Sequence, residues 1–248
     1  MPESIVYNED CLAAMKKMPD KAFDLAVVDP PYGGGSQKSY AERDGLHGGT
    51  AEWEQKPRSR FGGRFDKYNI SATRTGGTWA AKFSKGGIFD DFDIRHWDVA
   101  PSQEYFDELA RVSKNQIIWG GKYFGLPPTR CFLVWDKINI PEDFSMAMCE
   151  YAWTSFNANA KLFKYPPMAQ KQDERFHPTQ KPVALYEWIF NLYAKPGDRI
   201  LDTHLGSGSS RIAAYKAGLD FVGYEIDKYY FEKQEERFRQ QTVDMPLF

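Results

Sequence analysis

Short apolar runs alternate with segments of helical periodicity along most of the chain. Residues 23–28 (FDLAVV) form an apolar run that ends at two prolines, which lack the N–H group needed to extend a strand. Similar runs predict strands at residues 116–119, 131–135, 150–154, 199–202 and 220–225. Helices are predicted at residues 102–112, 183–193, 209–217 and 229–240.

This alternation of strands and helices is typical of a doubly wound α/β fold. In such a fold a mostly parallel sheet is covered by helices on both faces. Hydrophobic residues make up 42% of the 248 residues, which is enough for one sizeable core. We therefore expect a single domain over residues 1–248.

Residues 33–96 interrupt the pattern as a basic, glycine-rich and loop-rich insertion. Within residues 36–87 there are ten Lys or Arg and five acidic residues, a surplus of five positive charges (ten minus five), together with nine glycines. Aromatic side chains alternate with the basic ones, as suits phosphate contact and base stacking. The residues expected to contact nucleic acid are Arg58, Arg60, Arg64, Lys67 and Arg74. The alternative interpretation is a solvated loop with a small aromatic cluster.

The overall composition narrows the class of protein further. The formal net charge of −2 gives no general attraction to polyanions, so a nucleic-acid site must be a local patch. Cys11, Cys131 and Cys149 are too few and too widely spaced for a disulfide framework or a four-cysteine zinc site. We expect no metal, and we assign these thiols no catalytic role. Because no apolar stretch approaches the length of a bilayer span, we also expect a cytoplasmic protein.

Asp29-Pro30-Pro31-Tyr32 follows the first apolar strand directly. Ligand sites of parallel sheets lie at the carboxyl ends of the strands. The prolines fix a backbone carbonyl, Asp29 offers a carboxylate acceptor, and Tyr32 offers a flat ring for stacking. This combination suits a planar amine that is held by two acceptors. A strand-ending Asp-Pro turn is the structural alternative.

Residues 201–210 (LDTHLGSGSS) combine a strand end, a glycine turn and a helix start, and Glu225 ends the next strand. Such a unit brings backbone N–H groups close to a ligand, while the downstream carboxylate binds ribose hydroxyls. It predicts a nucleoside cofactor. The third glycine of the dinucleotide pattern is missing, as is the GK[ST] of a Walker loop, so both of those classes are disfavoured. An ordinary glycine-rich turn is the alternative.

Together these motifs resemble the beta-class DNA amino-methyltransferases, in which a DPPY block precedes the cofactor block. The resemblance implies a Rossmann-like fold, S-adenosylmethionine as the cofactor, and transfer of a methyl group to N6 of adenine in DNA after the base is flipped out. It gives Asp29, Pro30, Pro31 and Tyr32 the catalytic roles. The cofactor residues that it implies are Asp10, Lys181, Asp202, His204, Leu205, Gly206, Ser207, Gly208, Ser209 and Glu225.

Two of these assignments rest on shorter motifs. Residues 177–182 (HPTQKP) resemble the block that closes the methionine end of the cofactor, so Lys181 is expected to pair with the cofactor carboxylate. A loop and helix start is the alternative. Residues 8–11 (NEDC) resemble the family's acidic stretch beside the cofactor adenine, and the alternative for Asp10 is the N-cap of a helix that begins at Cys11.

The sequence departs from the family pattern at two places. His204 stands where phenylalanine is usual, which we interpret as a change of packing beside the cofactor and not as a new base. The family commonly inserts its target-recognition region between the expected strand at residues 150–154 and His177. Here only about twenty residues separate them, too few for a separate domain. The basic insertion must then share in recognition.

Other functions stay open at this point. Serine is more usual than Asp29 in enzymes for N4 of cytosine, so adenine is favoured; RNA, a protein glutamine amide, or an idle nucleic-acid-binding module are further alternatives. A homodimer and a role in restriction-modification are family tendencies. Residues 241–248 (QTVDMPLF) loosely resemble a peptide that binds the sliding clamp, with a frayed terminus as the alternative.

Overall fold

The computed structural model describes residues 2–32, 99–141, 147–167, 176–177 and 179–242 of the chain. Its described helices and strands all belong to one compact unit, which residues 1–32 and 100–248 form. The insertion at 33–96, with Arg58, Arg60, Arg64, Lys67 and Arg74, lies outside the described residues. So does the terminal peptide 243–248.

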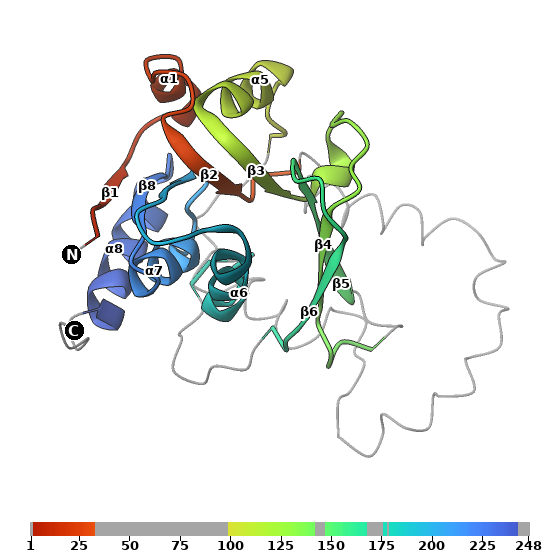
Figure 1. Ribbon diagram of the computed structural model, residues 1–248. Coiled ribbons are helices and arrows are strands. Elements are labelled where there is room, and N and C mark those ends of the chain that lie inside the picture. Colours follow the sequence, from red (N-terminus) through yellow and green to blue (C-terminus); the bar gives the residue numbers. More distant parts are fainter. Residues whose placement is uncertain (1, 33–98, 142–146, 168–175, 178, 243–248) are drawn as a thin grey trace, which may run out of the picture. The chain divides into compact units, whose positions relative to one another are not determined.

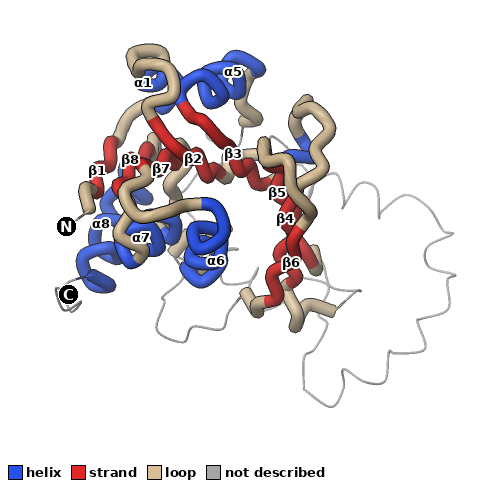
Figure 2. The backbone as a smooth tube through the Cα atoms, viewed as in Figure 1, coloured by secondary structure: helices blue, strands red, loops and turns tan. Residues whose placement is uncertain are grey.

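Eight strands form one sheet (Figures 1 and 2). The strands are β1 (Ser4–Tyr7), β2 (Phe23–Val28), β3 (Ser113–Trp119), β4 (Phe132–Asp136), β5 (Cys149–Thr154), β6 (Lys161–Lys164), β7 (Arg199–Asp202) and β8 (Asp220–Tyr224). The helices are α1 (Cys11–Met15), α5 (Gln103–Val112), α6 (Val183–Tyr193), α7 (Ser209–Lys216) and α8 (Lys228–Thr242), with a 3-10 turn η3 at Gly121–Tyr123.

The strand order is β1-β8-β7-β2-β3-β5-β4-β6, and among the described strands only the two pairings made by β5 are antiparallel. The chain leaves β2 toward β3 on one side of the sheet, whereas it leaves β7 toward β8 on the other. The boundary between β2 and β7 is therefore the topological switch point, where open α/β sheets bind ligands. The predicted doubly wound, mostly parallel sheet is confirmed.

Each face of the sheet carries its own core. Along β2, Leu25 and Val27 pack in the cluster that contains α6 and α7, while Ala26 and Val28 pack in the cluster that contains α1 and α5. Figure 1 shows these two groups of helices on opposite faces, with α8 beside α7. A strand alternates its side chains between faces, so a continuous apolar run is needed when both faces are covered.

The observed elements lie close to the predicted ones, but the strands β1 and β6 were not predicted. The strands at 23–28 and 199–202 and the helix at 183–193 have the predicted bounds, and the other predicted elements differ by at most three residues at either end. β6 was missed, because residues 157–176 read as a polar segment. It is a short edge strand with mostly exposed side chains, so burial imposes no apolar pattern on it.

Among the described residues, no helix combines the length and the apolar character that a membrane crossing requires.

Candidate active site at the carboxyl edge of the sheet

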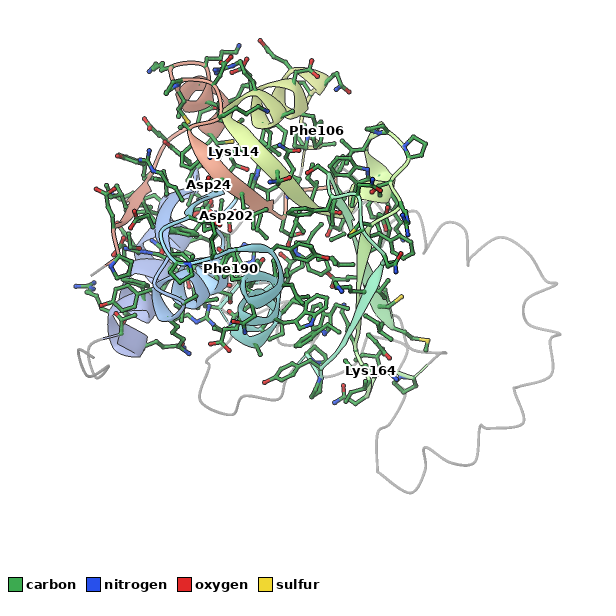
Figure 3. All side chains as sticks on the ribbon, in the orientation of Figure 1. Asp24, Phe106, Lys114, Lys164, Phe190 and Asp202 are labelled. Atoms are coloured by element: carbon green, nitrogen blue, oxygen red, sulfur yellow. The ribbon has the colours of Figure 1, made fainter. Side chains whose placement is uncertain are left out.

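The DPPY block and the glycine block meet at the switch point. Ala26 of β2 pairs with Leu201 of β7 in parallel register. Asp202, labelled in Figure 3, follows one residue later on β7, and Asp29 follows three residues later on the β2 side, so both acids lie at the same edge of the sheet. The sequence predicted this convergence, because both motifs follow strands that were expected to be parallel.

Both carboxylate oxygens of Asp29 are engaged. Tyr32 donates its hydroxyl to Oδ1 at 2.9 Å, and the Lys181 ammonium binds Oδ2. The Asp29 side chain is 16% exposed. Burial raises its pKa, the Lys181 charge opposes that rise, and the nearby Glu150 adds to it. An incoming amine must therefore share or replace one of these partners.

Lys181 is held by two carboxylates of the protein. Its Nζ atom lies 3.1 Å from Oε2 of Glu150 in addition to its contact with Asp29, and the lysine side chain is only 4% exposed. Burial alone would lower the lysine pKa, but the two carboxylates outweigh burial and raise it. An ammonium has three N–H donors, so these two contacts leave at least one of them for a further acceptor. The pairing of Lys181 with a cofactor carboxylate remains a prediction.

Glu150 is a site residue that sequence reasoning missed. Its Oε1 atom binds Lys137 Nζ at 2.6 Å, so it bridges two lysines. Burial disfavours the ionised glutamate, but the Lys181 and Lys137 ammonium groups outweigh burial and lower its pKa to about 2. Glu150 is the second residue of the antiparallel strand β5, and Lys137 follows β4. No sequence spacing links either residue to Asp29, and only the sheet order brings them together.

An aromatic group covers the Tyr32 ring. Tyr123 of η3 stacks on it with a centroid distance of 4.8 Å and an interplanar angle of 23°, and Phe124 contacts its edge. Gly120 precedes η3 in the left-handed region, at φ +68°. Tyr123 is 56% exposed, so the stack lies at the surface. The sequence did not single out Tyr123, since a single Tyr-Phe pair in a loop carries no distinctive pattern.

The glycine block forms the tight turn that the sequence predicted. Gly206 and Gly208 both have positive φ, at +51° and +73°, and Gly208 is the N-cap of α7. A Cβ on Gly206 would lie 3.2 Å from the His177 ring, so the glycine allows a close approach of the two loops. The Gly206 N–H donates to Oε2 of Glu225 at 2.8 Å. The loop, the HPTQKP block and the end of β8 are thus neighbours.

The other members of this block have mainly internal contacts. Asp202 accepts from the Ser210 hydroxyl and from the His204 N–H, and burial raises its pKa to about 7. Ser209 donates its hydroxyl to the Lys181 carbonyl at 2.7 Å. The Leu205 side chain packs in the core, and the Ser207 carbonyl accepts from an arginine of α8. Contacts of these residues with a cofactor remain predictions.

His204 is placed as a packing residue. Its Nδ1 atom lies 3.0 Å from the Thr203 hydroxyl, and its ring meets the edge of the Tyr105 ring at 5.4 Å between centroids. Burial lowers its pKa to about 4. A ring with so low a pKa is a weak proton acceptor near pH 7. This agrees with the interpretation that His204 replaces an aromatic residue and adds no base.

Asp10 caps helix α1. Its Oδ1 atom accepts from the Ala13 N–H at 3.0 Å, as an N-cap aspartate does. Nearby, Asn8 donates its side-chain amide to the Glu225 carbonyl at 2.8 Å, so the end of β1 lies beside the end of β8. The structural alternative for Asp10 is therefore present. A contact of Asp10 with a cofactor adenine remains a prediction.

Comparison with known proteins identifies the family. Residues 78–236 match the family model N6_N4_Mtase, described as DNA methylase, and this segment is more than half of the chain. The chain belongs to this DNA methylase family. The match includes the glycine block and begins after Asp29–Tyr32, so the geometry of the DPPY block is additional information about this DNA methylase.

Individual relatives agree with this assignment. The DNA methylase is 24% identical over 254 residues to the Type II methyltransferase M2.DpnII of Streptococcus pneumoniae, a match that covers 94% of this chain and 88% of the relative. Its fold resembles that of PvuII DNA methyltransferase (cytosine-N4-specific), with a TM-score of 0.55, 11% identity and coverage of 99% and 89%. It also resembles the putative DNA modification methylase TTHA0409 of Thermus thermophilus in complex with S-adenosyl-L-methionine, with a TM-score of 0.50, 15% identity and coverage of 97% and 96%.

Proposed function

We propose that this DNA methylase transfers a methyl group from S-adenosylmethionine to N6 of adenine in DNA. The observation that carries the proposal is the place of Asp29: a half-buried carboxylate directly after the carboxyl end of β2, beside Tyr32 and one strand from the glycine loop. Asp29 at the first position of the DPPY block favours adenine, because the cytosine-N4 enzymes of the same family more often have serine there.

The residues at the switch point fit the cofactor. Gly206 leaves room beside His177 that a Cβ would fill. Each oxygen of the Glu225 carboxylate accepts one backbone N–H, from Gly206 and from Asp227, and retains lone pairs for the ribose hydroxyls. We assign the ribose to Glu225 and the methionine carboxylate to the remaining Lys181 donor. The bound cofactor supplies an electrophilic methyl group on its sulfonium.

The protein residues would prepare the amine for attack. The lone pair of an exocyclic amine is delocalised into the base, so acceptors on both N–H bonds make it more nucleophilic. Asp29 and the Pro30 carbonyl are those acceptors, Pro31 fixes the backbone, and Tyr32 stacks on the ring. The base must leave the duplex to reach them. No covalent enzyme intermediate is required, and the raised pKa of Asp29 suits it to receive a proton that the methylated amine releases.

Nucleoside analysis tests this proposal directly. The purified protein is incubated with isotope-labelled cofactor and, in parallel reactions, with unmethylated DNA or with RNA. Each polymer is digested to nucleosides, and the labelled product is identified by mass spectrometry. N6-methyldeoxyadenosine is expected. N4-methyldeoxycytidine would reassign the base. Label in RNA alone would reassign the substrate, and no label in either polymer would refute the catalytic function.

A further inference from the structure

Four charged side chains form a line that begins at Asp29. In order they are Asp29, Lys181, Glu150 and Lys137, with signs that alternate along the line. The two lysines are 4% and 7% exposed, and each lies over a tryptophan ring, Lys181 over Trp119 and Lys137 over Trp135. Buried charges are stable only when they are paired in this way.

Glu150 therefore competes with Asp29 for the Lys181 ammonium. While Lys181 is bound to Asp29, it withdraws electron density from one of the two oxygens that the target amine needs. A lysine without another carboxylate would remain there, since a buried ammonium without a partner is costly. Glu150 lies 3.1 Å from the same ammonium and offers it a second position.

We infer that Glu150 is a positioning residue for methyl transfer: it takes the Lys181 ammonium when Asp29 accepts the target amine. The inference rests on the proposed function of Asp29. Lys137 limits how strongly Glu150 attracts Lys181, because its ammonium binds the other oxygen of Glu150 at 2.6 Å and neutralises part of the negative charge. β4 and β5, which bring Lys137 and Glu150 to this place, run side by side in Figure 1.

The two partners of Lys181 give predictions of opposite sign. Glu150→Gln leaves the whole ammonium to Asp29 and removes a nearby negative charge, so the pKa of Asp29 falls. Lys137→Gln frees Glu150 to hold Lys181 more tightly, so the pKa of Asp29 rises. The other ionisable groups that act on this cluster are Tyr32, Tyr186 and Asp202, and they are unchanged in both variants.

The test begins with the protein alone. Carbon-13 NMR titration follows the Asp29 carboxyl group, assigned with Asp29→Asn, in the wild type and both variants. The expected result is a lower pKa in Glu150→Gln and a higher one in Lys137→Gln. A general folding defect would not move the same carboxyl in opposite directions. An unchanged Asp29 pKa in both variants would overturn the inference, whether or not the protein methylates DNA.

Turnover supplies the second readout. Glu150→Gln should lower kcat by about tenfold, with the acid limb of its pH profile at lower pH and the cofactor Kd within about twofold of the wild-type value. Glu150→Asp keeps the charge and should restore most of kcat. Glu108→Gln is the matched control, since Glu108 pairs with Arg111 on α5, away from the carboxyl edge. Loss of activity through weaker cofactor binding alone would place Glu150 in the cofactor site and overturn the positioning role.

Discussion

Gly120 lies directly against the ring of Tyr32. A Cβ at Gly120 would overlap Cε1 of Tyr32, well inside van der Waals contact, and the residue has a φ of +68°. The backbone before η3 thus fixes where the Tyr32 ring can lie. Since Tyr32 also donates its hydroxyl to Asp29, the position of Gly120 bears on both parts of the proposed base pocket.

Gly120→Ala should therefore displace Tyr32 and impair base binding. The left-handed backbone alone costs about 1–2 kcal/mol for an alanine, and the overlap with the ring adds to that loss of stability. Binding of DNA that contains 2-aminopurine at the target position would report the flipped base by its fluorescence.

Variants at two other glycines distinguish the cost of the left-handed backbone from the cost of the overlap with the Tyr32 ring. Gly218 has the same φ of +68° with open space around its Cβ position, so Gly218→Ala should show the backbone cost alone. Gly125 has open space and no positive φ, and Gly125→Ala should be near neutral. Equal unfolding free energies for the Gly120 and Gly218 variants would show that the Tyr32 contact has no energetic consequence.

Asp29→Ala should abolish the reaction and spare cofactor binding. Removal of an acceptor that acts on the reacting amine should lower kcat at least about 100-fold, the size of effect seen when a single preorganised group is lost. Isothermal titration should still detect cofactor binding to this variant. Asp24→Ala, in the strand β2 that precedes Asp29, is the control, because Asp24 pairs with Lys114 and with the Arg199 N–H, away from the pocket. Near wild-type turnover by Asp29→Ala would remove the mechanism.

Glu225→Gln should weaken cofactor binding. The glutamine has one acceptor oxygen in place of two, so one of the N–H groups of Gly206 and Asp227 loses its partner, and the proposed ribose contact weakens. We expect the cofactor Kd to rise by about tenfold and kcat at saturating cofactor to change little. Glu232→Gln breaks only an exposed ion pair with Lys228 and should have no effect. An unchanged Kd in Glu225→Gln would move the ribose elsewhere.

His204→Phe should retain activity and alter the dependence of stability on pH. His204 has a pKa of about 4 in the folded protein against 6.5 ordinarily, so between these values the unfolded chain binds the proton and the folded one does not. The folded state therefore loses stability as the pH falls from 6.5 to 4, by about 3 kcal/mol at most.

The variant lacks this loss of stability, so its unfolding free energy should rise relative to that of the wild type as the pH falls. Asp202, whose pKa is raised to about 7, acts in the opposite direction, and it cancels in the difference because its partner at position 204 is the backbone N–H. Urea unfolding at pH 7 and pH 4.5 measures the difference. A constant difference between the two proteins would show that His204 is not held neutral.

The sequence by itself determined the fold class, the strand that precedes Asp29 and the glycine turn beside it. Apolar runs predict strands that are buried on both faces, and prolines and glycines mark where each strand ends, because these signals act within a few residues. Parallel strands end at one edge of a sheet, so the convergence of the DPPY and glycine blocks also followed from the sequence.

Only the tertiary structure decided which groups surround Asp29. Glu150 and Lys137 reach it through the order β2-β3-β5-β4, in which β5 is antiparallel, and Tyr123 reaches Tyr32 through a turn after β3. A single charge or ring on an edge or loop leaves no periodic signal in the sequence. Its partner depends on strand order and register, which are fixed when the whole sheet packs against its helices.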